Sequence, residues 1–236
     1  MALPRTHVRL KKELRLVDVY AIATGATLSA GFFLLPGIAA ISAGPGLVLA
    51  YMLAALPMIP ATFSVIELAT AMPRAGGVYY FLDRSLGPYY GTIGGRGTWL
   101  ALVLKVAFAL VGMGAYIALF FPVLQIVPIA VTIAVILGVI NLLGTKKSGG
   151  LQVALVFGLL SLLLIFITSG AFSIQPQHFE GFLAAGFDNM IATAGLVYIS
   201  YVGVTKVASL SEEVKDPERN LPRAVFLALA SAILVY

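Results

Sequence analysis

The sequence predicts an all-α protein whose helices cross a membrane several times. Hydrophobic residues make up 60% of the 236 residues and charged residues only 11%, and the mean hydropathy is +1.01. Soluble domains carry roughly 25% charged residues. Several uninterrupted apolar runs reach the roughly 20 residues that a helix needs to span the hydrocarbon core. The first run is too long for a removable signal peptide, and no small-residue cleavage site follows it. These observations predict a polytopic α-helical membrane protein.

We expect a single integral-membrane domain, 1–236, with complete spans and one partial span. The complete spans are expected at about residues 17–40, 46–71, 98–120, 123–143, 151–171 and 188–208, and the partial span at 221–236. Roughly 15 residues at about 1.5 Å each cannot cross the hydrocarbon core. The domain is therefore expected to be incomplete at its C-terminal end. Between spans, Tyr79-Tyr80-Phe81 are expected to pack an interfacial helix, and Lys146-Lys147 with Gly149-Gly150 to form a tight turn.

The lysine and arginine residues predict the orientation of the chain. Of the 15, all but Lys105 fall in segments that share one side of the membrane if the N-terminus is cytoplasmic. Because such residues concentrate on the cytoplasmic side, we expect a multi-pass protein of the inner or plasma membrane with its N-terminus in the cytoplasm. The net charge of +5 then reports topology, and no nucleic acid partner is expected. Lys105 lies inside the third span, where a charge is a functional hypothesis by default. A long lysine can also reach the interface, so both interpretations stay open.

The first span contains an interruption, Gly25 to Gly37, with the sequence GATLSAGFFLLPG. It opens with small, poor helix formers, includes the small residues Ser29-Ala30-Gly31 and closes on Pro36-Gly37, a natural helix stop. Irregular backbone survives in a membrane only where it is buried in protein or lines a cavity. We therefore expect a break at Ser29-Ala30-Gly31 that forms one wall of a binding site. The alternative is that Gly25, Ser29 and Ala30 form a small-residue face for helix packing.

The sixth span repeats this peculiarity. Aromatic residues, a hydroxyl and a glycine are mixed at mid-membrane depth in Tyr198-Ile199-Ser200-Tyr201-Val202-Gly203. Glycine-interrupted spans at corresponding places in a chain are the best sequence indication of a transporter's binding site. Here the two interrupted spans are five helices apart, which is the spacing that a five-helix inverted repeat produces.

Ordered motifs then extend over nearly the whole chain. The interruption is followed by a Glu-Leu pair, a Pro-Arg-Ala-Gly-Gly run before two tyrosines, an Ile-Asn-x-x-Gly motif, the sixth-span motif and an acidic-basic stretch rich in proline. These lie at Gly25–Gly37, Glu67-Leu68, Pro73–Phe81, Ile140–Gly144, Tyr198–Val204 and Glu212–Ala224. On these residues the chain resembles the N-terminal half of a permease of the amino acid–polyamine–organocation superfamily.

The resemblance implies a fold and a function. The fold would be the first five-helix repeat of a 5+5 inverted-repeat transporter, plus helix six and part of helix seven, with helices one and six broken at mid-membrane. The function would be secondary active transport of an amino acid or related amine by alternating access, as a symporter or antiporter coupled to a proton or another cation. No enzyme activity, cofactor or metal site is expected. Two alternatives stay open: an amino acid sensor or partner subunit that does not transport, and a permease for a different small solute.

The two interrupted spans suit the two charges of an amino acid. A half-helix that starts at about Gly31 presents free N–H groups and the positive end of its dipole to an α-carboxylate. Unwound carbonyls at Ile199, Ser200 and Val202 suit an α-ammonium. By resemblance, Ala30 and Gly31, next to Ser29, occupy the carboxylate positions and Tyr201 lies beside the substrate. Gly25, Pro36, Gly37 and Gly203 are expected to allow the helix breaks.

Three further features qualify this site. Ala30 replaces the hydroxyl that is usual in the family, so recognition there is expected through the backbone. Proton-coupled members can carry a lysine midway along span five, which would substitute for a sodium ion, and the region of residues 157–159 has none. Finally, Glu212, Glu213, Lys215 and Arg219 are expected to form a salt-bridged cytoplasmic link with a conformational role.

Overall fold

The computed structural model describes residues 11–142 and 145–236, without the side chains of residues 30, 145–149 and 178. Arg5 and Arg9 of the basic arm, Gly144, and the side chains of Lys146 and Lys147 therefore lie outside the described residues. The regular elements are α-helices and short 3₁₀ helices. They are α1 (Leu16–Phe33), α2 (Leu35–Ala43), η1 (Gly44–Gly46), α3 (Leu47–Ala71), α4 (Val78–Leu86), α5 (Pro88–Phe120), α6 (Ile126–Leu142), α7 (Thr145–Ala171), η2 (Pro176–Phe179), α8 (Phe187–Tyr201), η3 (Val202–Glu213) and α9 (Pro217–Val235).

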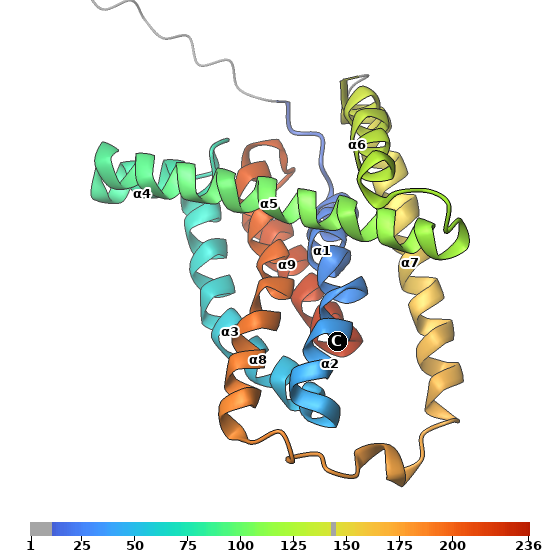
Figure 1. The fold of residues 1–236 in the computed structure, drawn as a ribbon. Coiled ribbons are helices and arrows are strands. Elements are labelled where there is room, and N and C mark those ends of the chain that lie inside the picture. Colours follow the sequence, from blue (N-terminus) through green and yellow to red (C-terminus); the bar gives the residue numbers. More distant parts are fainter. Residues whose placement is uncertain (1–10, 143–144) are drawn as a thin grey trace, which may run out of the picture.

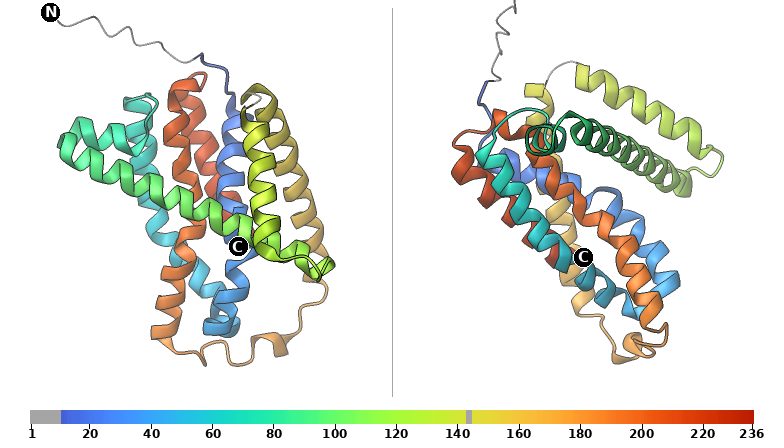
Figure 2. Two further views of the ribbon diagram at one scale, coloured as in Figure 1. Left: turned by 45° about the horizontal axis from the view of Figure 1, so that its top comes forward. Right: turned by 90° about the vertical axis from the view of Figure 1, so that its left-hand side faces the viewer.

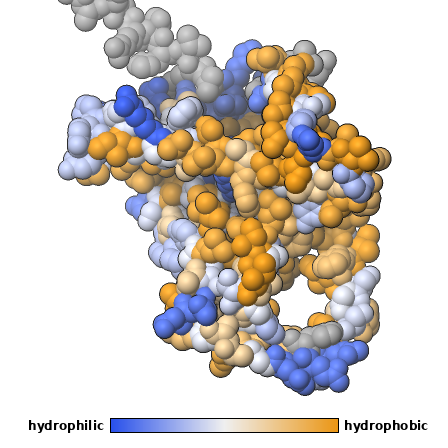
Figure 3. All heavy atoms as spheres, in the orientation of Figure 1, coloured by the Kyte–Doolittle hydropathy of each residue, from blue (hydrophilic) through white to orange (hydrophobic). Residues whose placement is uncertain are grey.

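The prediction of a polytopic membrane protein is confirmed. Among the described residues, five helical stretches are long and apolar enough to cross a membrane: Leu16–Phe33, Leu35–Ala71, Pro88–Phe120, Gly150–Ala171 and Phe187–Glu213. Helix α6 is equally apolar but has only 17 residues. Apolar side chains cover much of the outer surface, and polar ones gather mainly at its two ends (Figure 3). This distribution is the one expected for a surface that faces lipid.

The core lies among α1, α3, α8, η3 and α9, which run roughly side by side (Figure 1). Helix α7 packs against α1, and α5 crosses the outside of this bundle with α4 at one end and α6 at the other. The right-hand view in Figure 2 shows α5 and α6 set apart from the bundle. The largest fully buried side chains are Tyr201, Leu28, Met58 and Leu221, one from each of the four central α-helices.

The boundaries of the first two spans differ from the prediction. Pro36-Gly37 does not end the first helix: α1 ends at Phe33, and a new helix, α2, begins at Leu35. Proline is tolerated in a first helical turn because its missing N–H would have no partner there. Pro36 therefore lies in the first turn of α2. The chain then reverses through Gly44–Gly46, where the sequence predicted the link.

Later boundaries also differ. Helix α5 begins at Pro88, ten residues before the expected start of the third span. The expected tight turn at residues 146–150 is helical, because α7 begins at Thr145. The seventh helix, α9, begins at Pro217 rather than near Leu221 and includes Pro222 within its first two turns. Helices α5 and α9 therefore begin at prolines, which are favoured at the first helical position.

The sixth span changes helix type along its length. It is α-helical to Tyr201 and continues from Val202 to Glu213 as a 3₁₀ helix of 12 residues. Because 3₁₀ hydrogen bonds have poorer geometry, runs beyond about 3–4 residues are uncommon, and a 3₁₀ stretch within a helix often marks a hinge or strain. The change occurs at Val202-Gly203, so Ile199 and Ser200 lie in regular α-helix rather than in the unwound backbone that the sequence predicted.

Three segments that are distant in sequence meet at one end of the bundle. The N-terminal arm pairs with the link after η3: the N–H groups of Glu13 and Leu14 donate to the Glu213 carbonyl at 2.9 and 3.0 Å, and the Lys215 N–H donates to the Leu14 carbonyl at 2.9 Å. The link between α3 and α4 joins them where the Ala75 N–H donates to Glu212 Oε2 at 2.8 Å. Basic residues of the arm, of the α3–α4 link and of α4 therefore lie at the same end.

Candidate functional site

The irregular backbone of α1 lies at Ser29. Its φ of −54° is helical, but its ψ is −125°, about 80° from the helical value near −42°. This ψ turns the Ser29 carbonyl and the Ala30 N–H away from their helical directions. The departure falls at the first of the three residues that the sequence singled out. It is confined to that residue, so a complete helix break at mid-membrane stays a prediction.

Carbonyl groups around Ser29 accept hydrogen bonds from side chains of other helices. The Lys105 ammonium of α5 donates to the Ala26 carbonyl at 2.9 Å, and the Tyr236 hydroxyl donates to the Thr27 carbonyl at 2.8 Å. Beyond Ser29, the Gly31 carbonyl accepts from the Tyr51 hydroxyl of α3 at 3.3 Å. The final carbonyls of any helix lack partners within it. The neighbouring helices therefore supply partners where the α1 ladder is disturbed.

Glycines allow α1 and the α8–η3 junction to approach closely. A Cβ on Gly31 would lie 2.7 Å from the Cβ of Ser200, whose hydroxyl is 3.5 Å from the Gly31 carbonyl. A Cβ on Gly203 would collide with the backbone of Ala26 and Thr27. The Ser29–Gly31 region and the Ser200–Gly203 region, far apart in sequence, are therefore in direct contact. We call this contact the kink site.

Three tyrosines close one side of the kink site. The rings of Tyr51 and Tyr236 are stacked at 4.9 Å, and Tyr201 meets them edge-on at 6.4 Å from Tyr51 and 5.1 Å from Tyr236. The Tyr201 hydroxyl donates to the Tyr51 carbonyl at 3.3 Å. The sequence prediction contained Tyr201 but missed Tyr51 and Tyr236. Tyr51 had a detectable signal, because it is the only polar side chain from Leu47 to Leu56.

The kink site gathers only part of the predicted set. Ser29, Gly31, Ser200, Tyr201 and Gly203 come together, and Ser200, Tyr201 and Gly203 are buried.

The other predicted residues are placed differently. Ile199 and Val202 expose 49% and 36% of their surface, so their side chains point away from the site. Gly25 and Gly37 lie in regular helix and make no break. A Cβ on Gly25 would lie 2.8 Å from Val156 of α7, so this glycine serves helix packing, the alternative role considered from the sequence. Ala30 belongs to α1, and its side chain lies outside the described residues.

Among the described residues, Lys105 of α5 brings a charged side chain to the kink site. Its ammonium reaches the carbonyl end of the α1 segment that precedes Ser29, and a cation is favoured at the C-terminal end of a helix. Within the described residues, no three His, Cys, Asp or Glu side chains come together as a metal site would need. The chemical groups at the site are therefore backbone amides, hydroxyls, aromatic rings and one ammonium.

Membrane-length helices packed around irregular backbone define the class: a polytopic helical membrane protein with a polar site inside its bundle. Comparison with known proteins supplies the family. The model of the amino acid permease family matches residues 18–236. The chain therefore belongs to the amino acid permease family, within the superfamily that the motifs indicated.

The curated relatives are permeases and transporters. The chain is 30% identical to the branched-chain amino acid permease BcaP of Bacillus subtilis, with 96% of the chain and 53% of the relative covered. It is 26% identical to the methylthioribose transporter of the same organism, with the same coverage. It is also 26% identical to the chloroplastic cationic amino acid transporter 7 of Arabidopsis thaliana, covering 97% of the chain and 44% of the relative. The chain thus spans about half the length of the curated relatives it matches.

Proposed function

We propose that this chain is part of a secondary active transporter that moves an amino acid by alternating access. The kink site would hold the backbone of the substrate. The observation that carries the proposal is that α1 touches the α8–η3 junction on both sides of the irregular residue Ser29, through Gly31 against Ser200 and through Gly203 against Ala26 and Thr27. Two helices that change conformation at the same level, five spans apart, are the arrangement expected around a transporter's substrate site.

Each side of the kink site suits one charge of the substrate. The N–H groups after Ser29 begin a new helical segment and favour a carboxylate. The sixth span changes from α-helix to 3₁₀ helix after Tyr201, and because 3₁₀ hydrogen bonds have poorer geometry, the carbonyls at this junction are more readily shared with an ammonium. In the present arrangement, the hydroxyls of Tyr51 and Ser200 point to the Gly31 carbonyl. These hydroxyls would therefore have to move, or bind the substrate, as it enters.

The side chain of the substrate is proposed to be neutral. The kink site offers the rings of Tyr51, Tyr201 and Tyr236, and Phe32 stacks on Tyr236 at 6.2 Å. Among the described residues that form it, none is acidic, and the nearby ammonium of Lys105 would repel a cationic side chain. An apolar amino acid such as leucine fits these surroundings better than lysine. The names of the relatives include both branched-chain and cationic amino acids. We therefore infer the type of substrate from the residues of the site.

Lys105 is proposed to act as a fixed cation in place of a bound ion. Its ammonium already donates a hydrogen bond to the Ala26 carbonyl, which would otherwise attract a free cation. We therefore expect transport that does not require sodium. Replacing external sodium with choline should leave uptake unchanged, and a strict sodium requirement would contradict this role.

The proposal is tested by uptake into proteoliposomes that contain the full-length gene product. Radiolabelled leucine and lysine are compared, each with and without a pH gradient, and empty liposomes serve as the control. We expect saturable leucine uptake that excess unlabelled leucine suppresses and excess lysine does not. If no amino acid shows saturable uptake under either condition, the transport function is refuted. Amino acid binding without uptake would instead support the sensor alternative.

A further inference from the structure

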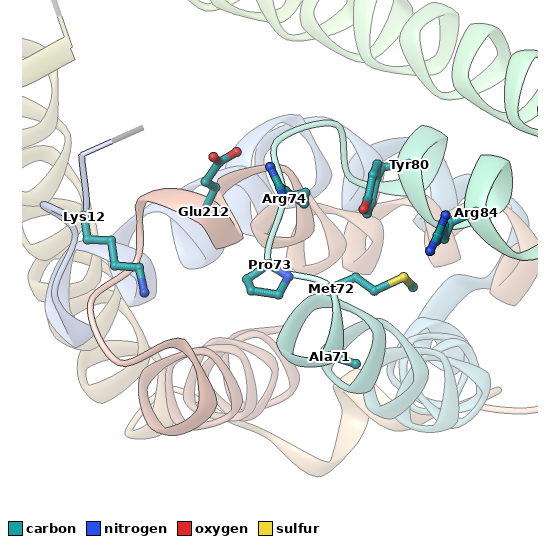
Figure 4. Close-up of a pocket in the computed structure, with 8 residues that line it drawn as sticks. All are labelled: Lys12, Ala71, Met72, Pro73, Arg74, Tyr80, Arg84 and Glu212. Atoms are coloured by element: carbon teal, nitrogen blue, oxygen red, sulfur yellow. The ribbon is translucent and has the colours of Figure 1, made fainter. Parts of the chain in front are cut away.

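A second polar site lies at the end of the bundle where the N-terminal arm meets the α3–α4 link. It is a cavity of about 380 Å³, within the range of sites for small ligands. Its walls come from the arm, the end of α3, the link, α4 and η3. The lining residues are Lys12, Ala71, Met72, Pro73, Arg74, Tyr80, Arg84 and Glu212. Figure 4 shows these side chains around the opening, and we call it the basic cavity.

Positive charge dominates the basic cavity. Lys12, Arg74 and Arg84 come from three different segments, and among the described residues that line the cavity Glu212 is the acidic one. One carboxylate oxygen of Glu212 already accepts a hydrogen bond from the Ala75 N–H. The C-terminal end of α3 adds about half a negative charge. Three full positive charges outweigh these two contributions, so the cavity attracts an anion.

We propose that the basic cavity binds a phosphate group, either free or in the headgroup of an anionic phospholipid. Arginine presents a planar fork of donors that matches phosphate oxygens in pairs, and lysine adds a point charge. The tetrahedral phosphate offers acceptors in several directions, as cations on separate walls require. The hydroxyl of Tyr80 adds one more donor to the lining.

The surroundings favour the lipid as the source of the phosphate. Ala71, Met72 and Pro73 form an apolar part of the wall, which suits the glycerol and upper acyl region of a lipid. Next to the cavity, α4 and the start of α5 expose Tyr79, Leu86, Tyr89 and Tyr90. Exposed aromatic residues of this kind gather at the level of the headgroups. Basic pockets between helices are known sites for phospholipid headgroups.

A bound phosphate would join segments that are otherwise held by few contacts. It would join the α3–α4 link through Arg74 to α4 through Tyr80 or Arg84, while Glu212 holds η3 to the same link. Because η3 continues directly from α8 at Tyr201, the ligand would stabilise the packed arrangement of the sixth span. Binding should therefore raise the thermal stability of the protein.

The test measures binding and melting of the full-length protein in nanodiscs of neutral phosphatidylcholine. One arm adds 20% phosphatidylglycerol to the lipid, and the other adds inorganic phosphate at millimolar concentration. The variants are Arg84→Gln, which alters an exposed residue of α4, and Arg74→Gln. The matched control is Arg96→Gln, which removes the same charge from an exposed position of α5 that does not line the cavity.

We expect phosphatidylglycerol to raise the Tm of the wild type and of Arg96→Gln. In Arg84→Gln the apparent affinity for it should fall at least tenfold. Arg84→Gln decides the result if Arg74→Gln fails to fold. An effect of inorganic phosphate alone, with the same dependence on Arg84, would identify soluble phosphate as the source and support the site. Equal responses of Arg84→Gln and Arg96→Gln, or no response to either phosphate source, would overturn the proposal.

Discussion

A single methyl group at Gly31 probes the contact on which the kink site depends. In Gly31→Ala the new Cβ would lie 2.7 Å from the Cβ of Ser200, 2.8 Å from its hydroxyl and 2.8 Å from the hydroxyl of Tyr236. Carbon atoms are normally about 3.5–4.0 Å apart. The Tyr236 hydroxyl is the far end of a side chain and can move, but Ser200 Cβ is fixed to α8. Helices α1 and α8 must therefore shift apart.

The size of the effect follows from the cost of overpacking. Inserting a methyl group into a packed contact typically costs about 1–3 kcal/mol. If this cost falls on the arrangement that binds substrate, affinity drops by roughly 5- to 150-fold. The control is Gly37→Ala in α2, where no atom lies within 4 Å of the new Cβ. Because alanine favours a helix by up to about 1 kcal/mol over glycine, the control should bind normally and be slightly more stable.

The assay is equilibrium binding of radiolabelled leucine to purified full-length protein that elutes as a single species. A double variant, Gly31→Ala with Ser200→Gly, removes the two nearest obstacles and should bind more tightly than Gly31→Ala alone. Contacting residues commonly show coupling of this kind, about 0.5–3 kcal/mol. If Gly31→Ala and Gly37→Ala bind leucine equally well, Gly31 is not part of the site and the reasoning fails.

Three further variants test single contacts. Lys105→Met loses a charge-assisted hydrogen bond of about 1.5–3 kcal/mol, so uptake should fall by at least roughly tenfold in proteoliposomes; normal uptake would mean that the lysine has no role in transport. Gly203→Ala should lower the Tm by at least about 2–4 °C. Its control, Gly195→Ala, whose Cβ meets no atom within 4 Å, should not lower it. Equal Tm values for the two variants would contradict the close approach of Gly203 to α1. Tyr51→Phe keeps its ring but loses a hydrogen bond of about 1 kcal/mol, so leucine affinity should change by roughly fivefold, and an unchanged Kd would exclude that hydroxyl.

The sequence identified the family and the membrane class because both depend on local signals. Apolar runs of membrane length are visible without any tertiary information. The small residues around Ser29 marked the irregular backbone to within a few positions, because poor helix formers and a nearby proline lower the cost of leaving the helix there. Helix ends were less accurate. Pro36 signals a boundary but not on which side of it the helix lies.

Long-range contacts could not be predicted. The partner of Lys105 is a carbonyl 79 positions away, and the Tyr51 hydroxyl reaches Gly31 from another helix. The basic cavity likewise depends on an arm, a link and a 3₁₀ helix meeting at one end of the bundle. Nor does periodicity distinguish 3₁₀ from α-helix in η3, because apolar spacing of three or four residues suits both.

The measurement that tests the kink site most directly is a structure of the full-length protein with a transported amino acid bound. We predict density for the substrate between residues 29–31 and 200–203, with its carboxylate near the N–H groups that follow Ser29 and its ammonium near the carbonyls at the end of α8. Substrate density elsewhere in the bundle, with Gly31 and Ser200 still in contact as they are here, would show that the kink site does not bind the substrate.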